Sequence, residues 1–350
     1  MVKIMYCHIQ VASWNVASMN TNPFEYWVDF RNQSFSTLIE AFQNYVDDPT
    51  SEVKVHEIFT DHMFSDLCCE MSQSGIEGID LVQRFWSDNF RERYAIRGFL
   101  LDKEVGAKRL FSMPDRITNS INLADGNILR RPSAISAYNE ISLDNIETWW
   151  REWKKFMFHT LIEIFTADQE IPAQPEPVCA LIEPLLRSKY PAITVEEQAG
   201  SVPLQILCLG LMDAIFIFAL NAVQPGIWEP LRRELSTMLI TNKAVRICSV
   251  LSNSYLDRDA ILLQEASAGL VDELQKWPAL QERFALLRPA TLDFRRNQNS
   301  LILVSRAFFR AQTAVDVTQQ VKRESEMITR LKSPVPGQQP MVGGGNSQFT

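Results

Sequence analysis

The sequence feature that most constrains the fold is an uninterrupted apolar segment at residues 206–223, ILCLGLMDAIFIFALNAV. Such a segment must be hidden from water around its whole circumference, either in a membrane or as the central helix of a large core. Asp213 lies at its centre, where an acidic side chain costs about 2.5–3.5 kcal/mol in a bilayer. No Lys or Arg flanks the segment closely. We therefore expect a buried core helix.

Across the rest of the chain, apolar residues recur at intervals of three and four, and β-branched alternation is hard to find. This spacing is typical of amphipathic helices, so we expect an all-α protein with two helical lobes. Helices are expected, among other places, at residues 22–46, at residues 257–276 and around residues 301–315.

Composition divides the chain into a predicted helical leader (residues 1–71), an N-terminal helical lobe (72–170), a C-terminal helical lobe (171–332) and a tail (333–350). Five prolines between residues 171 and 191 indicate a connector between the lobes. The tail is rich in Pro, Gly and Gln, a composition typical of disordered segments.

Charge is distributed in blocks of alternating sign. Residues 1–81 carry 3 basic and 12 acidic residues, residues 82–160 carry 13 and 10, residues 161–282 carry 8 and 16, and residues 283–332 carry 10 and 4. The net charge of −8 speaks against a protein that coats polyanions with its whole surface. A cleft with a basic lining is compatible with it, because clefts focus local charge.

The residues offer little support for catalysis or metal binding. Six cysteines and four histidines are scattered without a CxxC pair, so we expect reduced cytosolic thiols and no zinc site. No phosphate-binding glycine loop and no GxSxG sequence is present. The N-terminus lacks the features of a signal peptide. We expect a protein that is not an enzyme and needs no cofactor.

One acidic cluster keeps an enzymatic alternative open. Asp47, Asp48 and Glu52 resemble the magnesium-binding motif of helical terpene cyclases. The second magnesium motif of those enzymes is absent, and Pro49 breaks the helix that would present the acids. A magnesium-dependent helical enzyme is therefore the third hypothesis.

The segment after Asp144 predicts a helix with a basic face. Glu147 follows Asp144 three residues on, as in a capping box. The face consists of Arg151, Lys154, Lys155 and Phe158, at helical spacing. In a nucleic-acid groove, such cations would bind phosphate groups and the aromatic ring would stack on a base. A solvated face, with a Glu147–Arg151 pair, is the alternative interpretation.

Five sequence segments occur in an order and spacing that resemble a known family. They are GIEGIDLVQRF (75–85), RERYAIRGFLLDKEVGAKRLFSM (91–113), ISLDNIETWWREWKKFMFHTLIEIF (141–165), SKYPAITVEEQAGSVPLQILCLGLMDAIFIFALNAV (188–223) and VLSNSYLDRDAILLQ (250–264). Together they resemble the nucleoprotein of segmented negative-strand RNA viruses of the phlebovirus and tenuivirus group. This chain is longer than the compact members and has Leu101-Asp102 where the family has an arginine.

The resemblance implies a nucleocapsid protein of the virion and the host cell cytoplasm. It would encapsidate genomic single-stranded RNA without sequence preference and would contact the viral polymerase. It would also self-assemble into rings or filaments, through an N-terminal arm that docks on the neighbouring subunit. A non-catalytic helical scaffold is the alternative. The candidate RNA-binding residues are Lys103, Lys108, Arg109, Arg116, Arg130, Arg131, Arg151, Lys154, Lys155, Arg232 and Arg233.

Overall fold

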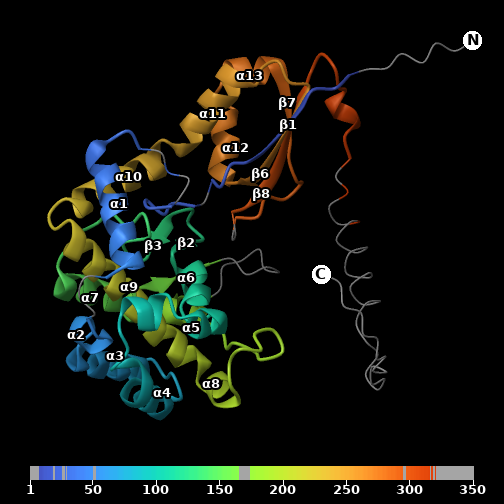
Figure 1. Ribbon diagram of the computed structural model, residues 1–350. Coiled ribbons are helices and arrows are strands. Elements are labelled where there is room, and N and C mark those ends of the chain that lie inside the picture. Colours follow the sequence, from blue (N-terminus) through green and yellow to red (C-terminus); the bar gives the residue numbers. More distant parts are fainter. Residues whose placement is uncertain are drawn as a thin grey trace, which may run out of the picture.

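The computed structural model describes residues 8–18, 20–25, 28, 30–49, 53–164, 174–294, 297–315, 317 and 320 (Figure 1). It corrects the all-α prediction. The protein is 52% helical and 12% strand, with a mixed four-stranded sheet, so the fold is mixed α/β. Figure 1 shows a helical lobe and, beyond one end of it, a smaller lobe in which helices cover the sheet. Each lobe has its own cluster of buried apolar side chains.

The helical lobe contains most of the chain between residues 33 and 241. Short β-hairpins and π-helical turns interrupt it, the turns at Trp86–Phe90, Ile96–Leu100 and Lys155–His159. Its helices are α1 (Gln33–Asp47), α2 (Val55–Ile58), α3 (Asp61–Gln73), α4 (Ile79–Phe85), α5 (Lys103–Lys108), α6 (Ser112–Thr118), α7 (Ile146–Lys154), α8 (Val195–Ala199), α9 (Ser201–Val223) and α10 (Trp228–Thr241). Its strands are β2 (Ser120–Asn122), β3 (Ile128–Arg130), β4 (Leu161–Ile162) and β5 (Glu176–Pro177), paired β2–β3 and β4–β5.

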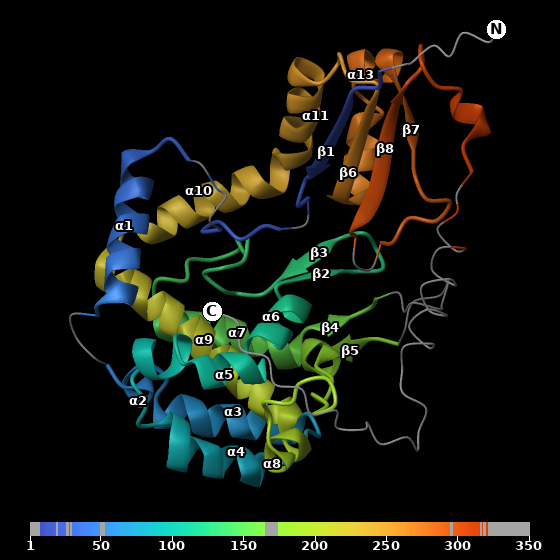
Figure 2. The same cartoon turned by 45° about the vertical axis from the view of Figure 1, so that its right-hand side comes forward.

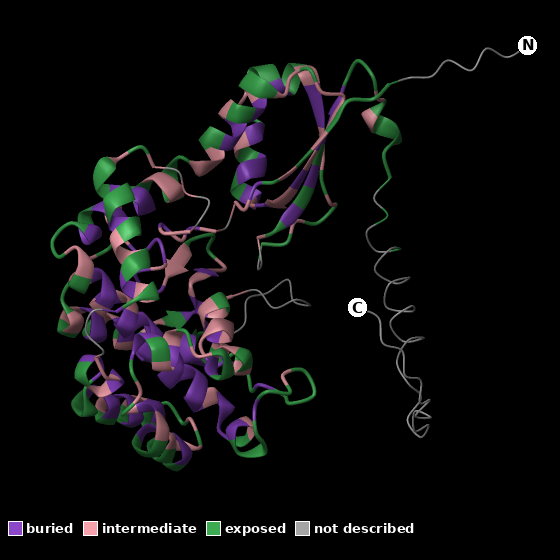
Figure 3. Cartoon of the chain, in the orientation of Figure 1, coloured by how far each residue is buried: buried purple, intermediate pink, exposed green. Residues whose placement is uncertain are grey.

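Helix α9 is the apolar segment expected to form the centre of the core. It is long and apolar enough to cross a membrane, yet 72% of its apolar window is buried inside the protein. Figure 3 shows buried residues along it and along the elements packed around it. At Gly210, the rings of Phe59 and Trp153 lie 3.7 Å from where a Cβ atom would be. The helix has no polar face because other elements surround it.

Residues 33–71 of the predicted helical leader pack into the helical lobe, whereas residues 11–15 form a strand of the smaller lobe. Leu38 of α1, Phe59 after α2 and Leu67 of α3 are completely buried in the core of the helical lobe. Removing residues 33–71 would therefore remove core side chains and not a detachable arm.

The smaller lobe contains the sheet that periodicity failed to predict. Its strand order is β1-β6-β8-β7, and β1 is parallel to β6 while the other pairs are antiparallel. Figures 1 and 2 show its helices on one face of the sheet. The elements are β1 (Val11–Asn15), α11 (Lys243–Ser254), β6 (Ala260–Ala266), α12 (Ala268–Leu274), α13 (Pro278–Arg283), β7 (Phe284–Leu287) and β8 (Asn299–Ser305).

The helix predicted at residues 257–276 is therefore wrong in part, and the helix predicted around residues 301–315 is wrong. The first range contains β6 before α12. The second contains the end of β8 and then a short 3-10 turn at Ala311–Thr313. Each strand has a short apolar run, AILL or LILV. Such runs have no periodicity that separates a buried strand from a buried helix. The strands form because β6 finds partners on both sides, one of them near the N-terminus.

Candidate nucleic-acid interface

The strongest candidate interface lies around α5, α6 and the β2–β3 hairpin. Asp102 caps α5 by accepting hydrogen bonds from the backbone N–H groups of Glu104 (2.7 Å) and Val105 (3.2 Å). Arg109 ends α5 in the left-handed region, at φ +63°. This reversal turns the chain into α6 and leaves the Arg109 side chain exposed.

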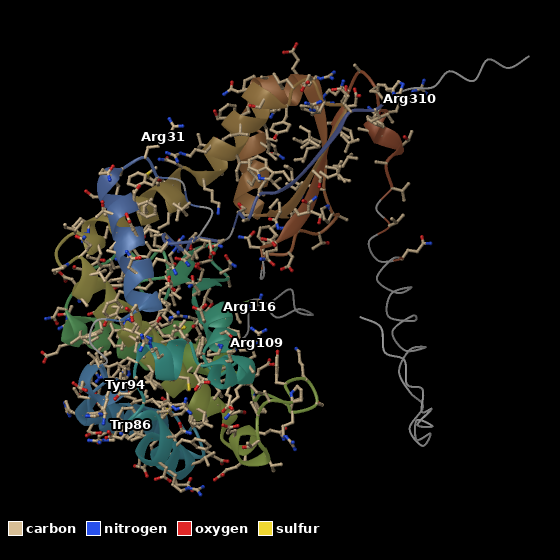
Figure 4. The ribbon with its side chains drawn as sticks, viewed as in Figure 1. Arg31, Trp86, Tyr94, Arg109, Arg116 and Arg310 are labelled. Carbon is tan, nitrogen blue, oxygen red and sulfur yellow. The ribbon has the colours of Figure 1, made fainter. Side chains whose placement is uncertain are left out.

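Three cations without a partner among the described residues lie on or between α5 and α6. Lys103, Arg109 and Arg116 are exposed, and the side chain of none of them forms a hydrogen bond or ion pair with the residues that the structure describes. Figure 4 shows Arg109 and Arg116 close together, and it shows Arg31 and Arg310 far from them. Arg130, on β3, lies on the hairpin that follows α6. We call Arg109, Arg116 and Arg130 the α6 cations.

Two polar atoms in this region are buried and have no hydrogen-bond partner among the described residues, Ser112 Oγ and Arg130 Nε. The guanidinium of Arg130 has one long contact, from Nη1 to the carbonyl of Ile128 at 3.4 Å. Burial lowers the pKa of Arg130, but an arginine remains charged at neutral pH. A buried charged donor without a partner is costly, so an anion that accepted its hydrogen bond would relieve this cost.

The residue next to Arg130 holds this surface in place. The Arg131 side chain is completely buried. Its Nε donates to Asp213 Oδ2 (2.8 Å), its Nη2 to Asp115 Oδ1 (2.6 Å) and its Nη1 to Thr118 Oγ1 (2.8 Å). Burial alone would lower the pKa of Arg131, but the two carboxylates outweigh it and raise the pKa. Arg131 therefore joins β3 to α6 and to α9.

The contacts of Asp213 explain how an acidic side chain is accommodated at the centre of the apolar segment. Its carboxylate also accepts hydrogen bonds from Ser133 Oγ (2.7 Å) and Trp153 Nε1 (3.0 Å). Burial raises the pKa of Asp213, and the charge of Arg131 and the hydrogen bond from Ser133 oppose that rise. The acid at the centre of α9 is thus the counter-ion of Arg131.

Several of the predicted RNA-binding residues are used inside the fold. Arg131 and Arg232 are completely buried, and Arg232 forms a two-point ion pair with Glu229 (2.6 and 2.9 Å). Arg233 donates from Nε to Asn139 Oδ1 at 3.1 Å. The two buried arginines are out of reach of a phosphate at the surface.

Two predicted lysines bridge elements. Lys108 Nζ lies 2.6 Å from Oε1 of Glu197, a buried residue that also closes the capping box of α8. Lys154 pairs with Asp66 of α3 and lies over the Trp150 ring, with Nζ 5.6 Å from its centroid. These contacts tie α5 to α8 and α7 to α3.

The predicted basic face of α7 keeps two exposed cations. Arg151 is exposed and contacts Glu152 at 3.2 Å, and Lys155 is exposed. Phe158 is buried, so its ring is packed in the core and not offered to a base. In the part of the chain that the structure describes, Arg151 pairs with Glu152 and not with Glu147, the partner expected from the sequence.

The described residues hold no group of three or more His, Cys, Asp or Glu side chains that could bind a metal ion. Asp47 and Asp48 lie at the C-terminal end of α1, and Asp48 pairs with Arg97 at 2.8 Å. Glu52, the third acid of the predicted cluster, lies outside the described residues.

Sequence reasoning missed Ser112 and Glu197. Nothing in the residue pattern marks a serine whose hydroxyl is buried without a partner among the described residues. Glu197, which forms an ion pair with Lys108, is distant from it in the chain. The capping-box spacing of Thr194 and Glu197 is visible in the sequence, but it indicates only a helix start.

Comparison with known proteins gives one match. A family model described as "Domain of unknown function (DUF8234)" matches residues 52–233, which is more than half of the chain. This range contains the α6 cations and the whole of α9. No curated protein and no solved structure matches the chain.

Proposed function

The chain belongs to the DUF8234 family, and since that description names no activity, we propose from its own residues that it is a nucleoprotein. It binds single-stranded RNA without sequence preference and self-assembles. The observation that carries the proposal is the group of α6 cations, which is held by a buried scaffold and forms no ion pair with the described residues.

Phosphate is the anion that best suits these side chains. Arginine presents several N–H donors in a fixed fork, which matches phosphate oxygens. Every nucleotide carries a phosphate, so contacts of this kind position RNA without reading its sequence. The acidic total charge of the chain is compatible with this, because the α6 cations act locally.

An aromatic ring lies beside the same surface. The hydroxyl of Tyr190 donates to Sδ of Met113, on α6, at 3.4 Å, and the Nζ atom of Lys189 lies 5.5 Å from the Tyr190 ring centroid. Tyr190 is half-buried and Lys189 is exposed. A ring and a cation that contact or adjoin α6 could supply stacking for a base and further charge for the RNA backbone.

The resemblance to viral nucleoproteins supports self-assembly. Because α1–α3 pack into their own lobe, the contact between subunits would use other surfaces than the packed faces of these helices. The viral polymerase is the further partner that this proposal implies.

The test is salt-dependent binding of a labelled oligouridylate to the full-length protein, measured by fluorescence anisotropy. The variant Arg109→Ala/Arg116→Ala is compared with Arg31→Ala/Arg310→Ala, which removes the same charge from exposed positions far from α6 (Figure 4). We expect at least tenfold weaker binding in the first variant. The slope of log K against log salt should fall by about 0.7 for each RNA phosphate that the variant no longer neutralises.

Two results would contradict the proposal. The first is an equal decrease of RNA affinity in both double variants, which would show that the decrease depends on the net charge of the protein and not on the position of the α6 cations. The second is a wild-type protein that purifies as a monomer without nucleic acid and ignores added RNA. That outcome would favour the non-catalytic scaffold.

A further inference from the structure

The sheet of the smaller lobe has a free edge that the proposed RNA function does not use. β1 is the outer strand of the order β1-β6-β8-β7. Within the part of the chain that the structure describes, no strand pairs with its other side. Figure 2 shows β1 along the border of the sheet, near α11 and the end of α10.

The backbone groups of β1 alternate between its two sides. The carbonyl of Gln10 accepts hydrogen bonds at 2.8 and 3.2 Å from the start of β6, and the N–H of Val16 donates to Gln264 at 3.0 Å. Residues an even number apart share a side in a parallel ladder, so the residues between them face away from β6. These outward residues are Val11, Ser13 and Asn15, all exposed.

A cleft of about 760 Å³ runs beside this edge, on the helix side of the sheet. Apolar side chains of α10 and α11 line it, among them Met238, Leu239 and Val250. Lys243 also lines it and donates hydrogen bonds to the carbonyls of Ala17 (2.5 Å) and Asn20 (2.6 Å). A strand added to β1 would lie over this cleft, and every second side chain would point into it.

The lining of the cleft also includes two acids, Glu25 and Glu265, and two cations, Lys243 and Arg246. Glu265 lies in the left-handed region at φ +54°, where the register between β6 and β8 shifts. Glu25 accepts only long hydrogen bonds, from the amides of Asn20 (3.4 Å) and Asn22 (3.5 Å). Neither carboxylate forms an ion pair with a described residue. Lys243 lies near enough to Glu265 to sense its charge, but both carboxylates keep oxygen atoms that can accept from a further cationic side chain.

We propose that an extended segment of a partner protein binds here by adding a strand to β1. Its main chain pairs with the outward N–H and C=O groups of β1, as in other cases of strand addition. Its inward side chains are apolar where they meet Met238 and Leu239, with a Lys or Arg where they meet Glu265.

A second copy of this chain does not fit the cleft through its own β1. The side chains of β1 on the helix side, Ala12 and Trp14, and Val16 just after it, already pack against the core of the smaller lobe. In a second copy they would be packed in the same way and could not enter the cleft. The side chains of a free extended segment are not packed in a core of their own, so they can enter the cleft.

The test uses the full-length protein and a capped nine-residue probe peptide. The peptide has valine at alternate positions, threonine between them, and one lysine in place of the central valine. Binding is measured by fluorescence anisotropy, and backbone amide exchange is followed with and without peptide. We expect saturable binding and slower exchange at Ser13 and Asn15.

The variant Ser13→Pro removes an outward N–H and leaves the ladder to β6 intact, because proline is tolerated on an edge strand. We expect it to bind the probe at least tenfold more weakly, while the control Ser13→Val retains wild-type affinity. Glu265→Gln, and a probe with glutamate in place of lysine, should also bind more weakly. If Ser13→Pro does not fold, Met238→Glu tests the apolar wall of the cleft.

The proposal is overturned if the probe shows no saturable binding to the wild type. It is also overturned if Glu265→Gln and Met238→Glu bind the probe as the wild type does, or if amide protection on binding appears away from β1.

Discussion

Arg131 and Asp213 form a two-point ion pair in the centre of the helical lobe. Nε of Arg131 lies 2.8 Å from Oδ2 and Nη2 lies 3.2 Å from Oδ1, and both side chains are completely buried. The pair connects the hairpin that bears Arg130 to the central helix α9. The position of the α6 cations therefore depends on a contact that no solvent reaches.

Replacing Asp213 by Asn should destabilise the protein by about 3–5 kcal/mol, because it leaves the buried charge of Arg131 without its main partner. The measurement is urea unfolding followed by far-ultraviolet circular dichroism. Asp115→Asn is the matched control, since Asp115 is a quarter exposed and water can replace part of its contact. Equal destabilisation in the two variants would contradict the central role of Asp213.

Replacing Lys108 by Met should lower stability and leave RNA binding unchanged. It removes the partner of the buried Glu197 carboxylate, which costs about 1–3 kcal/mol. RNA affinity is measured by anisotropy at low temperature, where the variant remains folded. Lys103→Met is the control for the loss of stability, because Lys103 is exposed and has no partner among the described residues. A tenfold decrease of affinity in Lys108→Met alone would return Lys108 to the RNA-binding set.

The free energy of unfolding should increase between pH 8 and pH 10.5 because of Lys243. Burial lowers the pKa of Lys243 from its ordinary value of 10.5 to about 8. Between these values the unfolded chain binds a proton that the folded protein does not, so stability increases with pH. A neutral amine still has two N–H donors for the carbonyls of Ala17 and Asn20.

The measurement for Lys243 is urea unfolding at a series of pH values, compared with the variant Lys243→Met. Lysines and tyrosines common to both proteins cancel in the difference. We expect the wild type to gain about 1–3 kcal/mol relative to the variant across this range. Parallel curves would show that Lys243 titrates alike in both states.

The sequence alone predicted several local features well. The all-apolar segment predicted a buried helix, and α9 is one. Helix starts with clear caps were also visible, but the structure moves the cap of α7 by one residue, from Asp144 to Asn145. These predictions succeeded or nearly succeeded because they depend on neighbouring residues, whose geometry the chain itself sets.

The candidate site was predictable only in part. Basic residues near α5 and α6 could be counted from the sequence, yet Arg109 is exposed and Arg131 is completely buried. An arginine remains unpaired only if the fold places no acid beside it, and Asp213, which is distant in the sequence, pairs with Arg131. The number of charged residues in a segment does not show which of them form such ion pairs.

The sequence by itself determined the helical periodicity, the burial of α9 and the charge of each segment. The tertiary structure alone decided that AILL and LILV form strands and that Arg131 and Arg232 serve the core while Arg109 and Arg116 face solvent. The physical reason is the range of the interactions. Helical hydrogen bonds join residues four apart, whereas strand pairs and buried ion pairs join residues that meet only when the chain has folded.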